Sequence, residues 1–83
     1  MNLPATIAPL EVATPGVQVV PLASGRWRVT SRSGRLLGHL EAVPSASGDD
    51  AFRAMRFSVR ERGFRMVGEY RTATDAADAL HYG

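Results

Sequence analysis

The chain has 83 residues, which is enough for one small domain. It contains no cysteine, so disulfides and thiolate metal sites are excluded, and all ten basic residues are arginine. Arginine suits phosphate and guanine recognition, but the codon bias of a GC-rich genome is the better explanation of an arginine-only set. No apolar run approaches the roughly 18 residues of a membrane span, and no targeting signal is recognisable. We therefore expect a cytoplasmic protein with no membrane partner.

The first sixteen residues, MNLPATIAPLEVATPG, are apolar but interrupted by proline. Proline disfavours both a helix interior and a central strand. We therefore expect residues 1–16 to form a proline-rich N-terminal arm and residues 17–83 to form a single domain. Residues 17–20 fit a short edge strand that ends at Pro21.

Residues 26–43 predict the first β-hairpin. In 26–30 the side chains alternate, with Trp27 and Val29 inward and Arg26 and Arg28 outward. Residues 31–34 (SRSG) are typical of a turn, and 35–43 return as the second strand. Residues 44–50 (PSASGDD) have the composition of a solvated loop.

Residues 52–71 predict a second hairpin with a turn at 61–63, and Gly68 indicates either a bulge or a close backbone approach. In its first strand we assign the larger apolar side chains to the core face: Met55, Phe57 and Val59. The opposite, outward face then holds Phe52, Ala54, Arg56, Ser58 and Arg60.

Thr72 followed by Asp75 indicates a helix start, because the threonine caps the first turn. Four apolar residues then recur at helical spacing: Ala73, Ala76, Ala77 and Leu80. The predicted fold is α+β, a small antiparallel β-sheet of three to five strands in two hairpins, packed against one short C-terminal helix. The predicted core consists of Trp27, Val29, Leu36, Leu40, Met55, Phe57, Val59, Tyr70 and Leu80.

Few residues are suited to catalysis or to metal or phosphate binding. His39 and His81 have no partner at metal-ligand spacing, and no serine lies in a nucleophile motif. The glycines of GRLLGH do not match a phosphate-binding loop. We expect a non-enzymatic protein with no catalytic residue, cofactor, metal or small-molecule substrate.

The outward arginines are the remaining signal. Arg26 and Arg28 share one side of their strand, as Arg56 and Arg60 share one side of theirs. Arg65 and Arg71 would join them if the bulge at Gly68 brings both to that face. Such a row fits duplex DNA, with phosphate contacts setting the register and one or two arginines reading guanine. A sheet covered by a helix on one face needs a polar opposite face in any case.

Residues 52–82 resemble the sheet-plus-helix DNA-binding domains of plant ethylene-response factors and the arm-binding domains of integrases. The likeness lies in two strands joined by a tight turn, the VGEY pattern at 67–70, Thr72 and the alanine-rich helix. It implies a sheet laid in the major groove, with Arg53, Arg56, Arg60 and Arg65 as contacts. The chain departs from that pattern by an extra hairpin, a helix that stops near Gly83 and no following catalytic domain. As a whole it also looks like short proteins of actinobacteria and their phages and plasmids, which implies no activity.

Two functions are therefore expected. The first is a small DNA-binding accessory or regulatory protein that contacts duplex DNA through Arg26, Arg28, Arg53, Arg56, Arg60 and Arg65. The alternative is a protein-interaction module or oligomeric adaptor, binding a second copy or another protein through residues 1–20 or a sheet edge. RNA binding is less favoured, because the sequence gives no exposed aromatic pair for base stacking.

Overall fold

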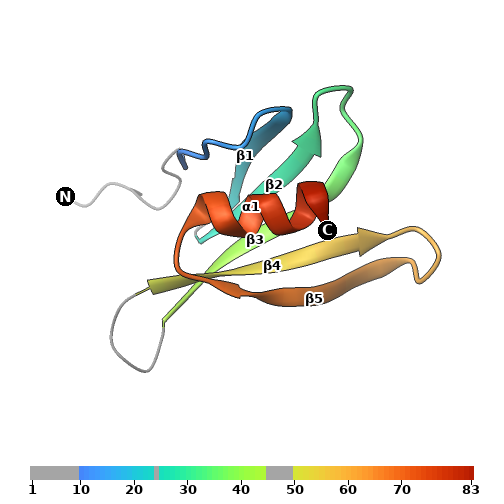
Figure 1. Cartoon of the computed structure of the whole chain (residues 1–83). Helices are drawn as coiled ribbons and strands as arrows, with labels where there is room; N and C mark the ends of the chain where they lie inside the picture. The colour runs from blue at the N-terminus through green and yellow to red at the C-terminus, as the bar shows by residue number, and fades with distance from the viewer. Residues whose placement is uncertain (1–9, 24, 45–49) are drawn as a thin grey trace.

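The computed structural model describes residues 10–23, 25–44 and 50–83. Five strands and one helix follow in chain order: β1 (Val17–Ala23), β2 (Arg26–Ser31), β3 (Leu36–Pro44), β4 (Asp50–Ser58), β5 (Gly63–Tyr70) and α1 (Ala73–Tyr82). The strands form one antiparallel sheet in the sequential order β1-β2-β3-β4-β5. Helix α1 lies across one face of it (Figure 1). The predicted α+β class is confirmed.

The core lies between α1 and this face of the sheet. Its fully buried side chains include Val29, Leu40 and Leu80, and Trp27 is 8% exposed. The helix contributes mainly alanines, which bring its backbone close to the sheet, where Ala54 is also fully buried. The predicted inward positions of Trp27 and Val29 in β2, and the predicted buried alanines of α1, are therefore confirmed.

Both ends of α1 are satisfied by specific contacts. The Thr72 side chain accepts a hydrogen bond from the backbone N–H of Asp75, so the predicted N-cap is confirmed. At the other end, the Arg56 guanidinium donates to the carbonyl oxygens of Ala79 (2.7 Å) and Leu80 (3.3 Å). A cation at this position also interacts favourably with the negative end of the helix dipole.

The facing of β4 is opposite to the prediction. Ala54 and Arg56 point toward α1, and Phe52 packs against the core with them. Met55 therefore lies on the other face of the sheet, as does Phe57, which shares that face because strand side chains alternate. Both faces of β4 carry apolar residues, and the sequence prediction places the larger ones in the core. The close approach of the alanine-rich helix instead requires the small side chain of Ala54.

Three further expectations need correction. Val59 is not a core residue, because it lies in the β4–β5 turn and is 77% exposed. Leu37, rather than Leu36, packs against the core, because a register shift between Val29 and Thr30 changes which β3 side chain faces inward. Strand β1 continues through the proline at position 21 to Ala23, which an edge strand permits.

Other predicted details are confirmed. Tyr70 packs partly buried against the core. A register shift between Ala54 and Met55 of β4 places Val67 as an extra residue beside Gly68, so the bulge in β5 lies where expected. Residues 45–49 of the expected loop lie outside the described residues.

Part of the N-terminal arm packs on the helix. The Thr14 hydroxyl is within 2.6 Å of Asp78 Oδ1, and Thr14 is only 5% exposed. The backbone N–H of Ala13 donates to the Thr74 hydroxyl, while Leu10 and Val12 pack against the core. Residues 10–16 thus belong to the folded unit, while residues 1–9 of the arm lie outside the described residues.

Candidate functional site

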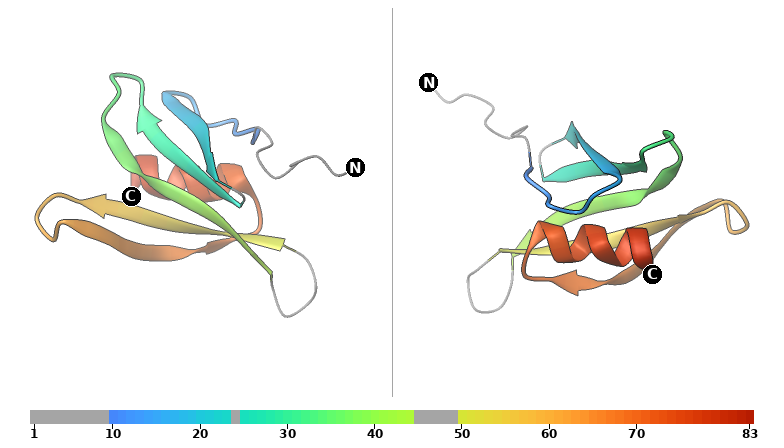
Figure 2. Two further views of the ribbon diagram at one scale, coloured as in Figure 1. Left: turned by 180° about the vertical axis from the view of Figure 1, so that it is seen from behind. Right: turned by 45° about the horizontal axis from the view of Figure 1, so that its top comes forward.

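The face of the sheet turned away from α1, here called the open face, has no described element over it (Figure 2, left). Strand pairing arranges its side chains in rows across the sheet, because paired residues share a face. One row, the charged row, runs from β2 to β5 through Arg26, Glu41, Arg53 and Glu69. The neighbouring row crosses all five strands through Val20, Arg28, His39, Met55 and Met66.

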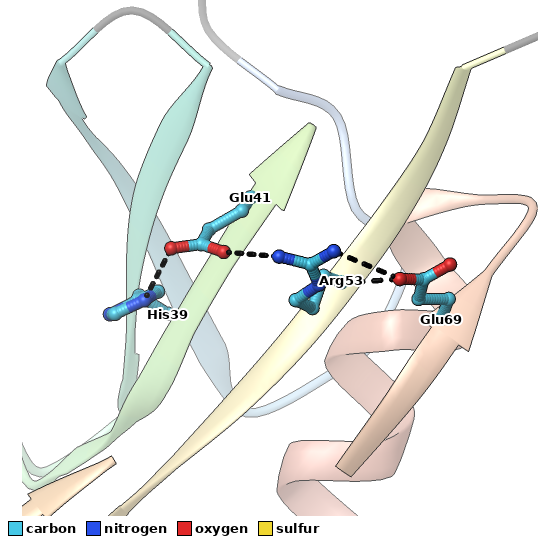
Figure 3. Close-up of polar contacts among 4 residues, drawn as sticks. All are labelled: His39, Glu41, Arg53 and Glu69. Atoms are coloured by element: carbon cyan, nitrogen blue, oxygen red, sulfur yellow. Dashed lines mark hydrogen bonds and ion pairs between the residues drawn. The ribbon is translucent and has the colours of Figure 1, made fainter. Parts of the chain in front are cut away.

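The charged row alternates in sign along its length. Arg53 lies between two carboxylates, with Nη2 3.1 Å from Glu69 Oε2 and Nη1 3.5 Å from Glu41 Oε1 (Figure 3). The other oxygen of Glu41 is 3.3 Å from His39 Nε2. The Arg53 side chain is 36% exposed and Glu69 is 45% exposed, so solvent weakens these pairs. Their main effect is to hold the three charged side chains in one line.

Next to the charged row lies an apolar cluster, here defined as Leu36, Met55, Phe57, Phe64 and Met66. The Phe64 ring centroid is 5.3 Å from that of Phe57 and 4.4 Å from that of His39. Met55 pairs with Met66 in the register. Phe64 is 43% exposed and Met66 56% exposed. Leu22 and Val20, from β1, are exposed to a similar extent.

A small depression opens between the apolar cluster and the arginines of β2. It has a volume of about 240 Å³ and is lined by Leu22, Arg26, Arg28, Leu36, Gly38, His39 and Phe64. Ligand pockets typically hold roughly 300–1,000 Å³. The depression is thus better suited to receive one protruding side chain than a whole small molecule.

The structure separates the six arginines that the sequence grouped together. Arg26 and Arg28 are exposed on the open face, and neither makes an ion pair within the described residues. Arg53 shares this face but is held between Glu41 and Glu69.

The other three arginines lie elsewhere. Arg56 is on the helix side, and its strand partner Arg65 faces the same way, with Nη1 3.7 Å from Glu61. Arg60 is exposed in the β4–β5 turn. The expected single arginine face is therefore reduced to Arg26, Arg28 and Arg53.

Sequence reasoning missed the carboxylates and the aromatic cluster of this face. Glu41 and Glu69 lie opposite Arg53 only because of the register of β3 and β5. Phe64 lies beside Phe57 for the same reason. The alternation of each strand shows which of its side chains share a face. To identify the open face, one must also know which side of β4 the helix covers.

The described part of the chain does not bring three or more His, Asp or Glu side chains together as a metal site. Over the same residues, no helix is long and apolar enough to cross a membrane. The short polar contact of Thr14 with Asp78 helps to fasten the N-terminal segment to α1. Comparison of the chain with protein-family models, curated proteins and solved structures finds no match.

Proposed function

We propose that this chain is a protein-interaction domain that binds its partner through the open face of the sheet. The observation that carries the proposal is the apolar cluster on this uncovered face, of which Phe64 and Met66 are exposed, with Leu22 beside Phe64 in the depression. Single exposed apolar residues are ordinary, but a contiguous group marks an interaction surface. Aromatic residues, methionine and arginine are also the types enriched in protein interfaces.

This surface differs from the one we expected for an interaction module. Residues 10–16 of the arm are already packed on α1, with Thr14 buried against Asp78. They are therefore unavailable as a free segment in this state. Three of the five strands that form the open face, β2, β3 and β4, are paired on both sides, and a surface restrained in this way loses little conformational entropy on binding.

The proposal keeps the chain non-enzymatic. On the open face, His39, Glu41 and Glu69 are engaged in one line of contacts with Arg53. A general acid or base needs a cleft that holds a substrate against it. The depression beside His39 is small and receives a side chain more readily than a substrate.

Site-directed photo-cross-linking tests the proposal. A benzoyl-phenylalanine at Phe64 should give a discrete protein adduct in cells that express the chain. The same group at Tyr82, an aromatic residue 70% exposed at the end of α1, is the matched control and should give none. Met66→Glu should reduce the Phe64 adduct, because it places a charge in the apolar cluster. Equal adducts at both positions, or no protein adduct at Phe64, would show that the open face is not the docking surface.

DNA binding through the same face is a second candidate, favoured by Arg26 and Arg28, which are exposed and form no ion pair with the residues that the structure describes. Glu41 and Glu69 lie on this face and would repel phosphate, which is why we rank it second. Fluorescence anisotropy with duplex DNA at ~50 and ~200 mM salt tests it. If both arginines contact phosphate, the Arg26→Ala, Arg28→Ala double variant should lower the salt slope by about 1.8. Wild-type protein that shows no binding at ~50 mM salt would exclude this role.

A further inference from the structure

The charged row of the open face is complementary to its own reverse. From β2 to β5 its signs are plus, minus, plus, minus, through Arg26, Glu41, Arg53 and Glu69. Read from β5 to β2 the signs are minus, plus, minus, plus. Two such rows laid against each other in opposite directions therefore place every arginine against a glutamate.

We propose that the partner of the open face is a second copy of this chain, bound face to face about a two-fold axis. This inference rests on the proposed function of the open face. The axis runs parallel to the strands, between β3 and β4, in the plane where the two copies meet. Such a rotation lays each row on the same row of the second copy in reverse order, which is the isologous arrangement of symmetric dimers.

The rotation brings opposite charges together along the whole charged row. Arg26 lies opposite Glu69 of the second copy, and Glu41 lies opposite its Arg53. In the next row His39 lies opposite Met55 of the second copy. In the same row Met66 lies opposite Arg28 of the second copy, so the apolar side chains of β4 and β5 pack on β3 and β2 of the second copy, and the charged rows form a polar border along one side. Packed sheets cross at about 30° because of their twist, which keeps the overlap close to the axis.

Other face-to-face orientations lose this match. A two-fold axis perpendicular to the strands would reverse the order of the rows, laying the charged row on the apolar cluster. Each strand would lie on the same strand of the second copy, so Glu41 would lose water against Leu36 and Glu69 against Phe64 without a counter-charge, which is costly. Charge complementarity therefore selects the orientation with the two-fold axis parallel to the strands, and does not only identify the face that binds.

The overlap also sets the expected strength. Four overlapping strands about 4.8 Å apart, with six residues each rising about 3.3 Å, present roughly 400 Å² on each copy. A standard specific interface buries about 800 Å² per partner. We therefore expect dimerisation in the micromolar range, visible by sedimentation velocity when the concentration is raised from about 1 µM to 1 mM.

Charge exchange tests the geometry on the whole chain. Arg26→Glu sets two glutamates against each other twice in the dimer, and Glu69→Arg does the same with two arginines. Each single variant should dimerise about tenfold more weakly than wild type. The double variant R26E/E69R restores opposite charges at both contacts and should dimerise like wild type. An equimolar mixture of the two single variants should form a heterodimer, because each supplies the charge that the other needs.

Matched controls separate this effect from net charge and from folding. Arg35→Glu, in the β2–β3 turn, and Glu11→Arg, beside α1, make the same charge changes away from the open face and should leave dimerisation unchanged. The double variant carries both substitutions, so any loss of fold caused by either would persist in it. Rescue in the double variant therefore reports contact between copies.

Two results would overturn the inference. One is a chain that remains monomeric to about 1 mM; the other is a dimer that neither single variant weakens. If the chain remains monomeric while benzoyl-phenylalanine at Phe64 still captures another protein, the second copy is the wrong partner and the proposed function stands. If the adduct is also missing, the proposed function fails with it. An adduct of twice the 8.9 kDa chain mass supports both.

Discussion

Replacing Arg56 by methionine should destabilise the domain by about 2 kcal/mol, because this arginine fastens the end of α1 to the sheet. The 2.7 Å bond to the Ala79 carbonyl has the length of a charge-assisted hydrogen bond, and such bonds contribute about 1.5–3 kcal/mol. The bond to Leu80 is longer, at 3.3 Å, and contributes less. Water can reach the freed carbonyls at the helix end, so the total stays near the low end of this range. Methionine retains most of the apolar stem, which limits the loss of packing.

Urea unfolding and thermal unfolding, each followed by circular dichroism, measure this change. A loss of about 2 kcal/mol should lower the melting temperature by about 12 °C in a domain of this size. Arg60→Met is the matched control: Arg60 is exposed in the β4–β5 turn and should change stability by less than about 0.5 kcal/mol. If R56M and R60M unfold alike, the helix contact of Arg56 is not a stabilising one. Arg56 would then have to be tested again as a DNA contact.

Three further substitutions test the fold by the same measurement. Thr72→Ala should cost about 1 kcal/mol, because it removes the acceptor for the Asp75 N–H, whereas Thr72→Ser should be near neutral. Gly38→Ala should cost about 3 kcal/mol, since the new Cβ would overlap the backbone carbonyl oxygen of Met55 on β4; wild-type stability would show that the strands can separate there. Leu80→Ala should cost about 3 kcal/mol, because Leu80 is 1% exposed in the core; a loss below about 1 kcal/mol would mean that the helix repacks easily.

The same residue type performs different tasks in this chain. Arg56 holds a helix end, Arg53 lies between two carboxylates, and Arg26 and Arg28 stay exposed. All four lie in strands with a similar polar and apolar alternation. What separates them is the side of the sheet and the neighbour in the register, so an arginine count alone is a poor guide to nucleic-acid binding in a small β-rich domain.

Local sequence determined most of the secondary structure. The alternation around Trp27 and Val29, the polar turn after β2, the glycine beside the bulge in β5 and the Thr72 cap depend on contacts within one or two neighbouring elements. Such signals can be read without knowing the rest of the fold. They were enough to predict the antiparallel sheet and its C-terminal helix.

Only the tertiary structure decided which side of β4 is buried. Phe52, Ala54 and Arg56 lie on one side, Met55 and Phe57 on the other, and apolar content alone favours the second set. The helix approaches the sheet through alanines and therefore requires the smaller residue, Ala54, beneath it. That choice turns Arg56 toward α1 and exposes the apolar cluster. Strand pairing then aligns Glu41, Arg53 and Glu69, because a row across the sheet joins residues that are far apart in the chain.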